Sequence, residues 1–322
     1  MTRLLEGWEA RSASSPALRF IDACLRGVGQ VMFQNHPLSG LLFLIAIGWG
    51  SYAARAPGIA LAGALALVTG TATAYWLRAD REDIHAGLFG FNAYLVGLAV
   101  ATFLVPSTVM WVYVVLGGGV STVAMLAVAR VCKTWEAPAL TAPFVLVAWL
   151  LLLATHAFVG ASGALPASAS IVPLDAAAAN PLRLGAFAEG VLQSISQVFL
   201  KGSGLAAVLL VAGLAVSSLR AAAWAVAGAA IAVLTAHSLG AESELVTGGL
   251  MGFSPVLTAI ALGAVFHGTG ARAAAYATVG TIFTVLVQGA LNALVTPFAI
   301  PTLTAPFVLV TWLFLLARPR LD

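Results

Sequence analysis

The segment Pro138–Leu152, PALTAPFVLVAWLLL, returns near the C-terminus as Pro301–Leu315, PTLTAPFVLVTWLFL. Twelve of the fifteen positions are identical, at a constant offset of 163 residues. Both copies lie within apolar sequence, which predicts two related halves embedded in a membrane. Duplicated membrane proteins tend to place a substrate site near the bilayer midplane, at the interface between the repeats. The shared segments are therefore the first candidates for a functional site.

The composition is typical of a membrane protein. Hydrophobic residues make up 61% of the 322 residues and charged residues 8%, whereas a typical soluble domain carries roughly 25% charged residues. Apolar stretches recur near residues 18–33, 38–54, 57–77, 84–104, 107–130, 139–159, 184–200, 204–219, 221–238, 246–266, 272–293 and 301–317. Because a full span needs about 20 residues, several stretches are marginal, and some are predicted to be half-helices.

The N-terminal sequence, the cysteines and the net charge argue against several other roles. The first twenty residues mix Arg and Glu without an apolar core, so we do not expect a cleaved signal peptide. Cys24 and Cys132 imply no disulfide framework and are predicted to be small buried hydrophobic side chains. The net charge of +3 comes from loop Arg and Lys, with no basic cluster typical of nucleic-acid binding. We therefore expect no nucleic-acid partner.

We expect a multi-pass protein of the cell inner membrane, and the distribution of positive residues predicts that both of its termini lie in the cytoplasm. The positive-inside rule gives this orientation because arginines flank the first apolar stretch and follow the last: Arg3, Arg11, Arg19, Arg26, Arg318 and Arg320. The segment from His156 to Pro181 has no Lys or Arg and is predicted to be an external loop. Arg55, Arg130, Lys133, Lys201 and Arg272 fit this scheme, whereas Arg220 does not.

This orientation predicts that the two halves are inverted. We assign residues 1–160 to the first repeat, 161–182 to the external linker and 183–322 to the second repeat. A half that begins inside and ends outside crosses the membrane an odd number of times, yet each half has six apolar stretches. One stretch in each half is therefore expected to enter the membrane and return on the same side.

A second duplicated motif is GLFGFN, residues 87–92, against GLMGFS, residues 249–254. Asn92 and Ser254 are good N-caps, and Thr141 and Thr304 can cap the helices that follow them. Four helix starts thus fall within or beside apolar sequence, where irregular backbone is tolerated only if it is buried or lines a cavity. Helix N-termini attract a carbonyl oxygen or an anion. Duplication favours a pore over the alternative, in which Pro and Asn simply kink membrane helices.

A third motif, LRGVGQVMF at residues 25–33 against LQSISQVFL at 192–200, carries a polar stripe in each half. The stripes follow one helix face at i, i+4 and i+8 and consist of Asp22, Arg26 and Gln30, and of Glu189, Gln193 and Gln197. A polar stripe in lipid should face the bundle interior or water. We predict that Asp22, Arg26 and Glu189 are structural, with Asp22 paired to Arg26, and that Gln30 and Gln197 face a pore.

Apolar residues recur beside these polar ones. Phe91 and Leu95 match Phe253 and Leu257, one helical turn apart, and Phe33 follows Gln30 by three residues. Opposed flat rings would admit a planar molecule and exclude hydrated ions. By spacing alone, such residues are more often core or lipid-facing than pore-lining.

QVMFQNHPLSG, GLFGFNAYLVGLA and the paired LTAPF segments resemble the urea transporter family, of the bacterial type, over nearly the whole chain. The resemblance implies an all-α polytopic membrane protein of two inverted repeats. Each subunit would have ten transmembrane helices and two re-entrant half-helices around its own central pore. It also implies a homotrimer in membrane lipid that passes urea down its gradient without a cofactor.

The resemblance further implies the residues of the pore. Oxygens would come from Gln30, Gln197, Thr141 and Thr304, and the apolar walls of the slot from Phe33, Phe91, Phe253, Leu95, Leu257, Val31 and Val198. Leu200 departs from the pattern, because an aromatic partner of Phe33 is expected there.

Other functions are less compatible with the sequence. The alternative within the transport class is a channel for ammonia or short-chain amides, but none of the five histidines is repeated between the aligned halves. Neither half carries the Asn-Pro-Ala of an aquaporin, and only Asp22 and Glu189 could serve ion coupling. An enzyme is not expected, because the chain has no His-Glu-x-x-His motif or carboxylate cluster for a metal. GTGARA at residues 268–273 follows no predicted strand, so it does not indicate a dinucleotide site.

Overall fold

The computed structural model describes residues 2–158 and 181–318, and the regular elements within these ranges are helices. Most of the predicted linker, residues 161–180, lies outside the described residues. A first helix, α1 (Thr2–Ser14), precedes two series of seven corresponding elements. The all-helical class predicted from the sequence is confirmed.

The two series follow the same order along the chain. The first comprises α2 (Pro16–Gln30), α3 (Pro37–Ala53), α4 (Pro57–Trp76), α5 (Arg81–His85), α6 (Gly90–Phe103), α7 (Thr108–Lys133) and α8 (Ala142–Ala154). The second comprises α9 (Leu184–Ser196) with η1 (Gln197–Phe199), α10 (Gly204–Ser217), α11 (Leu219–Ser238), α12 (Ser243–Thr247), α13 (Phe253–Ile260) with η2 (Ala261–Val265), α14 (Ala271–Val295) with η3 (Thr296–Phe298), and α15 (Ala305–Leu316).

Four described helices are long and apolar enough to cross a membrane: α4, α7, α11 and α14 with η3. A fifth candidate is the pair of α9 with η1 and α10, which is bent by 72° at a short break. Shorter apolar helices, α3, α6, α8, α13 and α15, complete the bundle. These lengths and compositions indicate a polytopic membrane protein.

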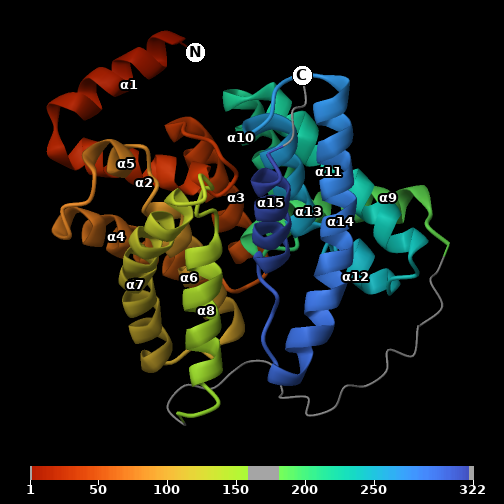
Figure 1. Cartoon of the computed structure of the whole chain (residues 1–322). Helices are drawn as coiled ribbons and strands as arrows, with labels where there is room; N and C mark the ends of the chain where they lie inside the picture. The colour runs from red at the N-terminus through yellow and green to blue at the C-terminus, as the bar shows by residue number, and fades with distance from the viewer. Residues whose placement is uncertain (1, 159–180, 319–322) are drawn as a thin grey trace.

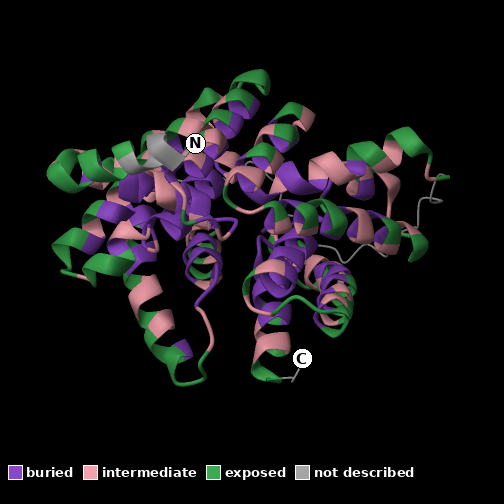
Figure 2. Ribbon diagram, turned by 90° about the horizontal axis from the view of Figure 1, so that it is seen from above, coloured by how far each residue is buried: buried purple, intermediate pink, exposed green. Residues whose placement is uncertain are grey.

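The halves lie side by side, and the duplicated helices α8 and α15 meet near the middle (Figure 1). In this view α8 ends at the lower side of the molecule, whereas α15 ends at the upper side, where both chain termini lie. Buried residues gather where the halves meet, and exposed residues cover the outer surfaces (Figure 2). Outer positions include large apolar side chains such as Trp76 and Leu219, 79% and 76% exposed, as a lipid-facing surface requires.

Backbone conformation repeats along with the helix order. Phe33 and Leu200, at equivalent positions, have φ angles of 63° and 58°, and Leu140 and Leu303 have 52° and 50°. A non-glycine residue with positive φ is uncommon, so its recurrence at matched positions shows that both halves make the same turns before α3 and α10 and before α8 and α15.

Several charged and thiol groups can now be placed. Cys24 and Cys132 are free and buried, as predicted. Arg220, which did not fit the charge pattern, donates to the carbonyl oxygens of His267 and Gly268 at 3.2 and 2.6 Å. Lys201, counted above among the positive residues that fit the topology, is only 4% exposed.

Candidate functional site

The two LTAPF segments meet through their threonines. Thr141 Oγ1 and Thr304 Oγ1 lie 2.6 Å apart, and each residue is 3% exposed. The contact joins the starts of α8 and α15 across the boundary between the halves. It brings together two residues that are 163 positions apart and equivalent by sequence.

Two tryptophans reinforce this junction reciprocally. Trp149 of α8 donates its indole N–H to the carbonyl oxygen of Pro301 at 2.8 Å, and Trp312 of α15 donates to that of Pro138 at 2.8 Å. Each tryptophan therefore binds the segment that precedes the other half's helix. Equivalent residues of the two halves thus make the same bond in opposite directions.

The predicted roles of the threonines and Asn92 as side-chain caps need correction. Thr141 and Thr304 occupy the N-cap positions, but neither hydroxyl bonds its own helix; the two hydroxyls instead contact each other. Asn92 lies inside α6, which begins at Gly90. Its Oδ1 accepts from the Phe144 N–H at 3.1 Å, so Asn92 caps α8 rather than its own helix.

Ser254 also differs from its predicted role. It lies inside α13, which begins at Phe253 with Gly252 as the N-cap residue. Its hydroxyl is buried and has no hydrogen-bond partner among the described residues. Ser254 therefore caps neither α13 nor α15.

The two glutamines make equivalent contacts. Gln30, the last residue of α2, donates its Nε2 to the carbonyl oxygen of Ala86 at 2.9 Å. Gln197, directly after α9, donates to that of Gly248 at 3.3 Å. Both glutamines are partly buried. Each amide is thus fixed by the turn that follows α5 or α12, and no described residue donates to either amide oxygen, which leaves both as free acceptors.

Two glycines allow the turns that follow α5 and α12 to lie close to the backbones of α2 and α9. A Cβ at Gly87, whose φ is +79°, would lie 2.2 Å from the Gly27 backbone nitrogen. A Cβ at Gly249, whose φ is +73°, would lie 2.3 Å from the backbone of Gln193 and Ser194. Only glycine combines positive φ with contact at this range. Gly87 and Gly249 are the first residues of the duplicated GLFGFN and GLMGFS motifs. The motifs therefore let the turns after α5 and α12 pack closely against α2 and α9.

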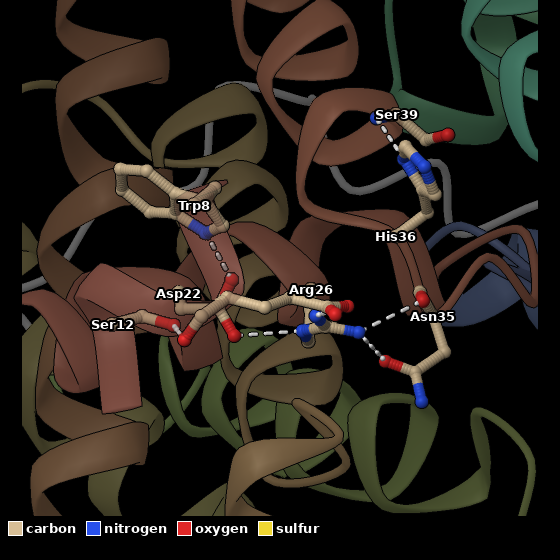
Figure 3. Close-up of polar contacts among 8 residues, drawn as sticks. Trp8, Ser12, Asp22, Arg26, Asn35, His36 and Ser39 are labelled. Carbon is tan, nitrogen blue, oxygen red and sulfur yellow. Dashed lines mark hydrogen bonds and ion pairs between the residues drawn. The ribbon is translucent and has the colours of Figure 1, made fainter. Parts of the chain in front are cut away.

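The charged part of the first stripe forms a local network that includes α1 (Figure 3). Arg26 Nε donates to Asp22 Oδ2 at 2.7 Å, which confirms the predicted ion pair. Trp8 of α1 donates to Asp22 Oδ1 at 2.6 Å, and Arg26 also bonds Asn35. Glu189, the counterpart of Asp22, is exposed instead. The charges of the first stripe are therefore neutralised locally.

The predicted apolar site residues belong to one packed cluster that spans both halves. Its members include Val31, Phe91, Leu95, Val198, Phe253 and Leu257, each at most 7% exposed. Phe33 is partly buried against this cluster. Its ring makes edge contacts with Phe266 and Phe307, at centroid distances of 5.8 and 6.0 Å, so residues of the second half pack around the Phe33 ring.

Sequence reasoning missed several of these residues. Trp149 and Trp312 are identical at the offset of 163, so their duplication was a usable signal. The edge contacts of Phe266 and Phe307 with Phe33 had no such signal, because they join distant segments. Within the described residues, no group of three or more His, Cys, Asp or Glu side chains could hold a metal ion.

Comparison with known proteins agrees with this arrangement. A family model described as Urea transporter matches residues 21–319. Urea transporter 1 of Ovis aries is 29% identical over 312 residues, which cover 94% of this chain and 78% of that protein. Urea transporter 1 of Mus musculus is 30% identical over 311 residues, with the same coverage of 94% and 78%. The matched region includes both LTAPF segments and both glutamines, and the chain belongs to the urea transporter family, whose members are transport proteins and not enzymes.

Proposed function

We propose that this protein is a passive channel for urea, with its pore at the junction of two inverted repeats. The observation that carries the proposal is the contact between Thr141 and Thr304 at the duplicated helix starts. A twofold axis through this contact would relate the halves. The reciprocal tryptophan bonds and the opposite ends reached by α8 and α15 support such an axis.

The chemistry of the glutamines suits urea. Urea offers N–H donors and one carbonyl acceptor, and the chain offers free amide oxygens at Gln30 and Gln197 with hydroxyls at Thr141 and Thr304. A neutral solute that sheds its water needs such partners, since each unpaired polar group in a dry slot costs about 1–3 kcal/mol. The apolar walls would be Phe33, Phe91, Phe253, Leu95, Leu257, Val31 and Val198, which hold the planar solute edge-on to the oxygens.

The remaining architecture follows the family resemblance. We propose ten membrane spans and two re-entrant half-helices per chain, in a homotrimer with one pore per subunit. The protein would lie in the inner membrane of the cell, with both of its termini in the cytoplasm. The neutral lining, in which Asp22 is already paired with Arg26, leaves no free charge for ion coupling at the first stripe.

A panel of solutes tests this function. Proteoliposomes exposed to an osmotic step of urea, formamide, acetamide, ammonia or glycerol would be followed by light scattering as they shrink and reswell. The proposal expects fast reswelling with urea and slower reswelling with glycerol, which lacks the planar N–H geometry. Preferential passage of ammonia or of the short amides over urea would favour the alternative channel and reject the assignment to urea.

A further inference from the structure

The two halves differ in how the first turn of their duplicated helix is capped. In the first half the Asn92 carboxamide accepts from the Phe144 N–H at 3.1 Å and donates to the Leu140 carbonyl oxygen at 3.4 Å. The second half has Ser254 at this position, whose side chain is shorter. The Phe307 N–H, equivalent to that of Phe144, receives no side-chain cap, and no described residue accepts its hydrogen bond.

Among the buried side-chain oxygens of the second half that lack partners in the described part of the chain, two lie on the adjacent helices α13 and α14. They are Ser254 Oγ, in a residue with 0% exposure, and Gln288 Oε1, in a residue with 1% exposure. The Gln288 amide is held at the start of α15, because its Nε2 donates to Thr302 Oγ1 at 2.7 Å and to Asn292 Oδ1 at 3.0 Å. Buried polar groups in folded proteins are nearly always hydrogen-bonded, to protein or to ordered water.

The packing of α13 on α14 places Ser254 and Gln288 at facing positions. Thr284 Oγ1 of α14 donates to Thr258 Oγ1 of α13 at 3.0 Å. Ser254 precedes Thr258 by one helical turn, and Gln288 follows Thr284 by one turn. Since the two helices are consecutive and joined by a short loop, they run in opposite senses, and Ser254 comes opposite Gln288 on the same faces.

The first half gives an independent indication of the same pairing. Asn92 corresponds to Ser254 and Met125 to Gln288, and Asn92 Nδ2 lies 3.6 Å from Met125 Sδ. The equivalent positions are therefore in contact in the half that has larger side chains. Compared with Asn92 in the first half, Ser254 in the second half is smaller. Compared with Met125 in the first half, Gln288 in the second half is more polar.

We propose that an ordered water molecule binds between Ser254, Gln288 and the N-terminus of α15, in the place that the Asn92 carboxamide occupies in the first half. The water accepts from the Phe307 N–H and the Ser254 hydroxyl, and it donates to Gln288 Oε1 and the Leu303 carbonyl oxygen. Buried waters typically make about three hydrogen bonds to groups that would otherwise be unsatisfied. The helix that carries Thr304 is thus capped by solvent, whereas the helix that carries Thr141 is capped by protein. This proposal does not depend on which solute the protein passes.

A density map of the native protein, at a resolution that resolves ordered waters, tests the proposal. The expected result is a peak within hydrogen-bond distance of both Ser254 Oγ and Gln288 Oε1. Absence of a peak there, or a direct bond between the two side chains, would overturn it.

Variants that give one half the residue found at the equivalent position of the other half test the same site. Ser254→Asn should expel the water and place the new amide on the Phe307 N–H, with a melting temperature at least equal to that of the parent. A peak that persists in Ser254→Asn contradicts the site. If that variant does not fold, Gln288→Met removes the acceptor and should abolish the same peak. The reverse pair in the first half, Asn92→Ser with Met125→Gln, should create a new peak beside Phe144.

Discussion

At the residue scale, the threonine pair has unused hydrogen-bonding capacity. Each hydroxyl provides one donor and two acceptor lone pairs, and the mutual contact of Thr141 and Thr304 at 2.6 Å uses one donor and one acceptor. One hydrogen and several lone pairs remain for a solute. A molecule that has both a carbonyl oxygen and N–H groups can bond the remaining hydroxyl hydrogen and the remaining lone pairs. Urea is such a molecule, which fits it to the proposed centre of the pore.

The first prediction concerns these hydroxyls. Thr141→Val and Thr304→Val keep the side-chain shape but replace the two hydroxyls with methyl groups, so the contact becomes apolar. A dehydrated solute then loses partners worth about 1–3 kcal/mol, which corresponds to a flux roughly 5- to 150-fold slower. Stopped-flow urea flux in proteoliposomes measures the effect. Thr→Ser at the same positions is the control and should retain most of the flux. Parent-like flux in folded valine variants would remove the central site.

The second prediction concerns the glutamines. Gln30→Leu and Gln197→Leu keep approximate size but remove the free amide oxygen and the bond to Ala86 or Gly248. Because the two positions are equivalent, each change should slow urea flux by a similar factor, roughly 5- to 150-fold for a loss of about 1–3 kcal/mol. Gln193→Leu, one turn earlier on α9, is the matched control and should have a smaller effect. Equal flux in all three variants would contradict the assigned pore role.

At the element scale, the turns after α5 and α12 depend on glycine. Gly87 and Gly249 combine positive φ with backbone contacts that leave no room for Cβ. These turns present the carbonyl oxygens that hold the glutamine amides. The turns after the short helices α5 and α12 therefore hold one glutamine amide in each half of the chain.

The third prediction tests this support. Gly249→Ala places a Cβ 2.3 Å from the α9 backbone, which cannot yield as a flexible side chain would. We expect lower recovery of folded protein and a lower melting temperature in detergent. Gly185→Ala, in α9 with nothing within 4 Å of the new Cβ, should be neutral or stabilising by up to about 1 kcal/mol, since alanine is the better helix former. Equal melting temperatures for the two variants would show that the α12 turn is not tightly seated.

The sequence was sufficient to predict the helical class and the equivalence of the two threonines, because duplication is visible as identity. It also located the Asp22–Arg26 pair, since i, i+4 spacing is local. It misassigned Asn92 as the cap of its own helix, because the residue reaches 52 positions along the chain to Phe144. Contacts between distant elements, such as Phe33 with Phe266, depend on helix packing and have no local sequence pattern.

At the scale of the whole molecule, the halves are related but not identical. The junction is reciprocal at the threonines and tryptophans, whereas Leu200 stands opposite Phe33 in the alignment and Ser254 opposite Asn92. The α1 network adds a further difference, because Trp8 binds Asp22 in the first half. A passive pore built this way is expected to conduct in both directions while its two ends differ in detail.

Urea flux without any ion gradient tests the central claim most directly. Purified protein in liposomes, with identical sodium, potassium and proton concentrations inside and outside, would be exposed to a urea gradient in a stopped-flow instrument. The account predicts rapid urea equilibration in either direction, slowed in the variant that combines Gln30→Leu with Gln197→Leu. Urea movement that appears only when a sodium or proton gradient is imposed would contradict it.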